Sequence, residues 1–172
     1  MRKFGKIIFS VLALGVIVLV YYWISSLAPK TPDLSKKHEI QGADHIPVGS
    51  PHPEYNSNPP SSGWHYAEPA REGFYDEELP DEQIVHNLEH GDIWIAYHPR
   101  LSQEIKEELK KIKDSKMIIT MRSRNEFDIS LVAWGRVDSF NVENNSLDTP
   151  RVKDFILRYR NKGPERVMPN PQ

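Results

Sequence analysis

The longest apolar stretch of the 172-residue chain covers residues 7–25, near the N-terminus, and contains no charged residue and no proline. As an α-helix it would be about 28 Å long, close to the hydrocarbon thickness of a bilayer. We therefore predict a single membrane-spanning helix whose partner is the lipid bilayer. The bases Arg2, Lys3 and Lys6 favour a cytoplasmic location for residues 1–6, which places the C-terminal part of the chain outside the cell membrane.

A cleaved signal peptide is the alternative interpretation of the same segment. Ser26, Leu27 and Ala28 loosely resemble the small residues of a cleavage site. The apolar run is, however, longer than the roughly 7 to 15 residues typical of a signal peptide, and Pro29 would follow directly after the cut. The aromatic residues 21–23 also suit the interfacial belt of a membrane helix. The pattern therefore favours an uncleaved signal-anchor.

After the anchor, residues 26–40 are polar and predict a tether, and residues 41–172 are enough chain for a single domain. Residues 44–80 hold seven of the fourteen prolines, which predicts a long segment with little regular structure. Five aromatic residues are interleaved with these prolines. They indicate that the segment packs on the domain as an ordered loop.

Apolar periodicity after residue 80 alternates between helical and strand spacing. Helices are predicted to begin at three residues that can cap an N-terminus, Asp81, Ser102 and Thr149, and Gly91 and Gly163 would end the first and last of them. Strands are predicted at residues 93–98, 117–122 and 129–137. This order predicts a small α+β domain, with about three helices on one face of a mainly antiparallel sheet.

The charge of the domain narrows the choice of partners. From residue 38 onward the chain carries 16 Lys and Arg against 23 Asp and Glu, a formal charge of −7. Nucleic acid is therefore excluded as a natural partner, because binding to phosphates needs a basic surface. Residues 68–92 contain nine acidic residues and one base, Arg71, which favours a cation.

The candidate chemistry lies in the seven histidines, all of which fall between residues 38 and 98. His86 and His90 are four residues apart on the first predicted helix, so both rings project from one face and can share one ion. His65, in a glycine-flanked loop, is a candidate third ligand. The same spacing also arises by chance, with imidazoles that only hydrogen-bond their neighbours.

A second motif overlaps the histidine pair. Residues 86–90 have the form His-x-x-Glu-His, in which two histidines hold zinc and Glu89 acts as a general base on bound water. The helix is short and no downstream third-ligand motif is present, which weakens this match. Glu89 can instead orient a ligand histidine or lie at the surface as an ordinary acid.

Other catalytic patterns are absent from the sequence. It has no Gly-x-Ser-x-Gly elbow, no phosphate-binding glycine loop and no cysteine. Met121 and Met168 offer thioethers that suit copper(I), although Met121 fits ordinary core packing and Met168 an unremarkable tail.

Five segments taken together resemble the domain-of-unknown-function 3105 family. They are residues 55–66 (YNSNPPSSGWHY), 73–75 (GFY), 79–91 (with VHNLEHG), 133–135 (AWG) and 163–165 (GPE). The resemblance covers nearly the whole domain, from about residue 45 to residue 165. It implies a bacterial extracytoplasmic domain behind an N-terminal anchor, in agreement with the topology above, and it implies no activity.

The resemblance also selects among the histidines. Four of the seven match histidines of the family pattern, namely His45, His65, His86 and His90. The resemblance therefore implies His65 as the third ligand of a metal site. Trp64 departs from the family pattern, which usually has proline before the loop histidine.

Three functions follow as hypotheses. The first is a membrane-tethered domain that binds copper or zinc through His65, His86 and His90, with His45, Met121 and Met168 as weaker candidate ligands. The second is a binding module without metal, whose Pro- and Tyr-rich loop docks a protein partner or another component of the cell envelope. The third is a zinc-dependent hydrolase that uses Glu89.

Overall fold

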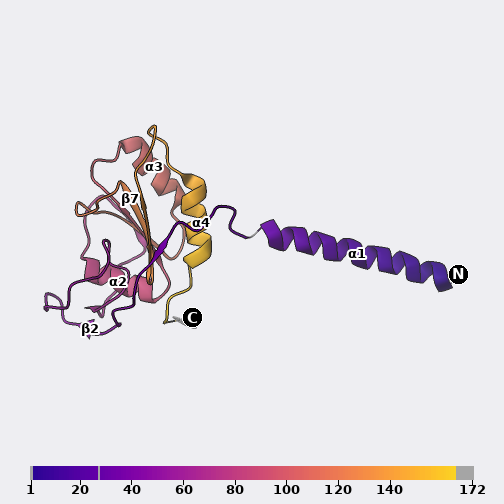
Figure 1. The fold of residues 1–172 in the computed structure, drawn as a ribbon, viewed down its shortest axis with the longest axis horizontal. Coiled ribbons are helices and arrows are strands. Elements are labelled where there is room, and N and C mark those ends of the chain that lie inside the picture. Colours follow the sequence, from indigo (N-terminus) through magenta and orange to yellow (C-terminus); the bar gives the residue numbers. More distant parts are fainter. Residues whose placement is uncertain (1, 27, 166–172) are drawn as a thin grey trace. The chain divides into compact units, whose positions relative to one another are not determined.

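The computed structural model describes residues 2–26 and 28–165, and the side chains of its first helix from Leu12 onward. The chain divides into two compact units, Met1–Lys30 and Thr31–Gln172. The first unit consists of helix α1, Arg2–Ser26, which covers the whole apolar run (Figure 1). Within the part of the chain that the structure describes, no helix is both long and apolar enough to cross a membrane. The anchor at residues 7–25 therefore stays a prediction from the sequence.

The second unit is built on a six-stranded sheet with the strand order β1-β8-β7-β5-β6-β4. Antiparallel pairing joins β1, β8, β7 and β5, whereas β5, β6 and β4 are parallel to one another. The prediction of a mainly antiparallel α+β domain is thus confirmed. The strands are β1 Lys36–Lys37, β4 Gly73–Tyr75, β5 Ile93–Tyr97, β6 Met117–Met121, β7 Ile129–Ala133 and β8 Arg136–Phe140.

Three helices cover both faces of this sheet, and the prediction that they share one face is wrong. Helices α3, Gln103–Ile112, and α4, Thr149–Tyr159, pack against the face that carries Ile93, Ile95 and Tyr97 (Figure 1). Helix α2, Asp81–Glu89, packs against the opposite face, over Trp94 and Ala96. The reason is that every residue of β5 is apolar and buried, so both faces of the central strand need a cover.

Two strands of the six-stranded sheet lie where the sequence predicted none. Strand β4 forms inside the proline-rich segment, and β1 extends the sheet into the segment predicted as a tether. The single strand predicted at 129–137 is in fact the hairpin of β7 and β8, which turns at Trp134 and Gly135. Gly135 has φ +67°, a conformation that glycine adopts without strain, and its N–H donates to the Ser61 carbonyl at 2.8 Å.

The helix ends agree with the sequence in part. Ser102 caps α3 by accepting a hydrogen bond from Ile105 N, and Gly91, at φ +81°, follows the end of α2, as predicted. Helix α4 is capped by Asp148, which accepts from Arg151 N at 3.1 Å, and not by Thr149. It ends at Tyr159, four residues before Gly163.

Asp81 is not the cap of α2. Pro80 takes that position without a side-chain hydrogen bond, and Asp81 is the first residue of the helix. Its buried carboxylate accepts from Arg122 Nε at 3.0 Å and from Arg122 Nη2 at 2.8 Å. The side chain that the sequence predicted as a local cap therefore makes a long-range ion pair that fixes α2 on the sheet.

Candidate metal centre

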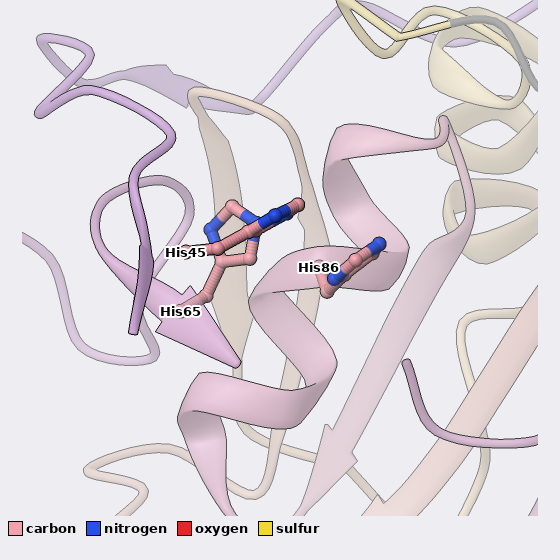
Figure 2. Close-up of side chains that lie close together, drawn as sticks. All are labelled: His45, His65 and His86. Carbon is pink, nitrogen blue, oxygen red and sulfur yellow. The ribbon is translucent and has the colours of Figure 1, made fainter. Parts of the chain in front are cut away.

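Four histidines gather around the C-terminal end of α2. His45 and His65 lie on β2, His45–Ile46, and β3, His65–Tyr66, two short parallel strands that pair these histidines in register. His86 lies in the last turn of α2 and His90 at its C-terminal cap. Figure 2 shows the rings of the first three lying together, two from the strand pair and one from the helix.

The rings are in close contact. His45 stacks on His86 with ring centroids 4.8 Å apart and an interplanar angle of 9°. His65 meets the edges of both, at centroid distances of 4.9 Å and 5.1 Å. His90 packs edge-on against His86 at 4.5 Å. Four imidazoles from three segments of the chain thus form one cluster.

Local backbone geometry explains how the loop brings His65 to the helix. Gly63 has φ +122°, and a Cβ at this position would lie 2.9 Å from the ring of Tyr55. The Tyr55 hydroxyl in turn donates to the Trp64 carbonyl at 2.7 Å. Glycine is therefore required next to the loop histidine, because only a residue without a side chain fits both the conformation and the space.

The tautomers of the two buried histidines follow from their hydrogen bonds. His65 Nδ1 lies 2.7 Å from the Gly63 carbonyl oxygen, and His86 Nδ1 lies 2.7 Å from that of Tyr66. A carbonyl oxygen only accepts, so both Nδ1 atoms carry a proton and donate it. In the neutral ring the remaining nitrogen, Nε2, then has a free lone pair. A backbone carbonyl on the far nitrogen is the usual support of a metal-binding histidine.

The lone pair of His65 faces another acceptor. Its Nε2 lies 3.1 Å from Glu89 Oε2, and His45 Nε2 lies 3.8 Å from the same oxygen. A carboxylate accepts hydrogen bonds and donates none, so two acceptors meet here in a buried place. Only a proton or a metal ion between them makes this contact favourable.

A second chain of contacts lies at the outer end of the cluster. His86 Nε2 lies 3.2 Å from His90 Nε2, which in turn lies 3.3 Å from Glu165 Oε2, and a proton on His90 Nε2 can be donated to either of them. Burial lowers the pKa of His86, and the neighbouring histidines lower it further, against the opposing effect of the Tyr66 carbonyl. His86 is therefore neutral at pH 7, and its Nε2 is ready to bind a cation.

Exposure divides the cluster into a closed side and an open side. The His65 side chain is fully buried and that of Glu89 is 9% exposed. His90 is 20% exposed, His45 is 47% exposed and Glu165 is 58% exposed. An ion at the inner side is shielded from solvent, while the rim is open to it.

Glu165 reaches the cluster because the chain after α4 packs on the end of α2. Its N–H donates to the Glu89 carbonyl at 3.1 Å, and Asn161 N–H donates to the Gly91 carbonyl at 2.7 Å. Gly163 lies so close that a Cβ there would be 2.0 Å from the Glu89 carbonyl oxygen. Sequence reasoning quoted residues 163–165 only as part of a resemblance and did not identify Glu165 as a site residue.

The candidate ligands predicted from sequence are brought together, but in two overlapping groups. The ligand atoms of each group lie within 4.8 Å of one another, and the groups are His45–His65–His86 and His86–Glu89–His90. His45, predicted as a weaker candidate, belongs to the first. Met121 is not in either group, since it packs with the core under α3 and α4. Met168 lies outside the described residues.

Glu89 holds the position of the general base in the hydrolase hypothesis. In the structure its carboxylate is buried and contacts His65, and it belongs to one of the two ligand groups. This placement suits a ligand, or a group that orients a ligand, better than a base that exchanges protons with bound water and solvent.

Comparison with known proteins gives a family and no activity. No curated protein and no solved structure is significantly similar to the chain. The model of a family described as "Protein of unknown function (DUF3105)" matches residues 45–172, which include every described member of the cluster. This match confirms the resemblance seen in the sequence. The chain belongs to the DUF3105 family.

Proposed function

We propose that the domain binds one transition-metal ion, zinc or copper, through Nε2 of His65 and of His86, with His45 completing their ligand group from its exposed side. The carboxylate of Glu89 lies against His65, and His90 lies at the rim. The observation that supports the proposal best is the pair of buried histidines whose Nδ1 atoms donate to backbone carbonyls. Their lone pairs converge on a region that also holds a carboxylate, a set of donors that suits a divalent cation.

The donor set favours Zn²⁺ and Cu²⁺ over Cu⁺. Imidazole nitrogen and carboxylate oxygen suit the divalent ions, whereas copper(I) prefers thiolate or thioether sulfur. The chain has no cysteine. Met121, the candidate thioether among the described residues, lies with the core on the other face of the sheet. Copper(I) is therefore expected to bind more weakly than Zn²⁺ or Cu²⁺.

We also propose that residues 7–25 tether the domain to the cell membrane, with the N-terminus in the cytoplasm. The support is the sequence of this segment and the bases before it. After carbonate washing of cell membranes, the full chain is expected to stay in the membrane pellet. Its release into the supernatant would contradict the tether without affecting the proposed metal site.

Calorimetric titration of the full chain, purified without an affinity tag and stripped of metal, tests the metal site. We expect about one equivalent of Zn²⁺ or Cu²⁺ to bind. The substitutions His65→Ala and His86→Ala are expected to lower the affinity by about 100-fold or more, because loss of even an outer-shell partner of a ligand costs about 10- to 100-fold.

Two further variants make the titration decisive. His65→Gln keeps most of the buried volume, so a loss of affinity there is not a consequence of a cavity. His98→Ala is the matched control, since His98 accepts a hydrogen bond from Arg100 N and belongs to neither ligand group. Equal affinities of wild type, His65→Gln and His86→Ala would refute the site.

A further inference from the structure

We propose that the cluster offers one ion two alternative positions that share His86, and that the ion passes from the outer position to the inner one. This inference rests on the metal-binding function proposed above. It adds that the domain takes up and releases the ion through a defined entry position. The juxtaposition that carries it is a pair of ligand groups, His45–His65–His86 and His86–Glu89–His90, joined at a single imidazole.

The shared histidine limits the cluster to one ion at a time. A bridge between two ions would need both ring nitrogens of His86. Its Nδ1 is committed to the Tyr66 carbonyl at 2.7 Å, so only the lone pair on Nε2 is available. One lone pair binds one ion, and the two groups are therefore alternatives.

The two positions differ in their charge. The inner group consists of three imidazoles, of which His65 is fully buried and His45 is 47% exposed, whereas the outer group includes the buried carboxylate of Glu89. The outer group contains His90, whose Nε2 also faces the exposed carboxylate of Glu165 at 3.3 Å. Paired acidic and imidazole groups at the rim attract a divalent cation, which identifies the outer position as the place of entry.

Transfer between the positions exchanges two ligands in turn. The bond from the ion to His90 Nε2 breaks as a bond to His65 Nε2 forms, and the bond to Glu89 then breaks as a bond to His45 forms, while the ion keeps its charge. His86 stays bound throughout. Glu89 Oε2 already lies 3.1 Å from His65 Nε2, so it still holds the ion while His65 binds. Continuous ligation by His86 and one further residue keeps the barrier to movement low.

An ion that enters and leaves through a rim position leaves a kinetic signature. If His90 and Glu165 act only in passage, then substituting them slows uptake and release by the same factor. The equilibrium affinity, set by the inner position, then stays the same. A permanent ligand behaves differently, because its loss speeds release and weakens binding.

Stopped-flow measurement of Zn²⁺ uptake, and of its release to a fluorescent chelator, tests the inference on the full chain. For His90→Ala and Glu165→Gln we expect both rates to fall by about tenfold, with an affinity within about threefold of wild type. His98→Ala is the control and is expected to keep both rates.

Each other outcome identifies what has failed. Unchanged rates in His90→Ala, or a loss of affinity as large as that of His65→Ala, would overturn the two-position inference and leave the metal site intact. If wild type binds no Zn²⁺ or Cu²⁺, the proposed function itself fails, and the inference fails with it.

Discussion

Replacing Asp81 with alanine is expected to lower the free energy of unfolding by about 3–5 kcal/mol, as seen when one partner of a buried ion pair is removed. The Arg122 side chain is only 6% exposed and makes two hydrogen bonds to the Asp81 carboxylate. Without that carboxylate, a guanidinium charge stays buried without its counter-ion. Urea denaturation followed by circular dichroism measures the change.

The substitution of Asp81 is also expected to affect the metal site, because Arg122 connects helix α2 to the proline-rich loop. Its Nη1 also donates to Asn58 Oδ1 at 2.6 Å, which links the proline-rich loop to the N-terminal end of α2. Helix α2 carries His86, and the loop leads to His65. We therefore expect the stability loss to be accompanied by weaker metal binding.

An exposed pair of the same chemistry is the control for Asp81. Asp114 contacts Arg160 at 2.6 Å, and 62% of its side chain is exposed. Exposed ion pairs contribute little to stability, so Asp114→Ala is expected to leave the urea midpoint nearly unchanged. Equal midpoints for the two variants would show that the buried pair does not stabilise α2 as described.

Gly163→Ala is expected to destabilise the domain by about 3 kcal/mol, at the upper end of the usual cost of overpacking. The new Cβ would lie 2.0 Å from the Glu89 carbonyl oxygen and 2.3 Å from Gly91 N. Both are backbone atoms at the end of α2, so neither can move aside as a side chain would. Residues 161–165 would have to move away from α2, and Glu165 would then move away from His90.

Gly49→Ala separates crowding from backbone conformation. A Cβ at Gly49 meets nothing within 4 Å, although its φ of +77° costs about 1 kcal/mol for alanine. We expect the urea midpoint of Gly163→Ala to be clearly lower than that of Gly49→Ala. If Gly163→Ala is no less stable than this control, then the packing of residues 161–165 on α2 is not tight.

The sequence correctly predicted those structural features that depend only on residues close together in the chain. Ser102 caps the start of α3, and Gly91 follows the end of α2. The four-residue spacing of His86 and His90 places the two rings in contact. These features need no knowledge of the rest of the fold.

Long-range packing decided the features that sequence reasoning missed. Strands β2 and β3 are only two residues long, too short for a periodic pattern of apolar residues. The sequence of the loop therefore does not predict that His45 pairs with His65. Asp81 looked like a cap because its true partner, Arg122, is 41 residues away. Glu165 reaches His90 through the packing of a glycine, which has no hydrophobic signal.

The strand break at Gly135 was missed for a different reason. Ile129, Leu131 and Ala133 alternate before the turn, and Val137 continues the same two-residue spacing after it, so the segment resembles a single strand. The second covered face of the sheet was missed because β5 has apolar residues at every position, and such a run shows no preferred face.

The central claim, that His65 and His86 hold a metal ion, is tested most directly by the elemental content of the full chain, isolated without chelator or metal-affinity tag. Plasma mass spectrometry is expected to find about one equivalent of zinc or copper in wild type and in His98→Ala, and far less in the double variant His65→Gln, His86→Ala. Absence of both metals from wild type, with none taken up when Zn²⁺ or Cu²⁺ is added, would contradict the claim.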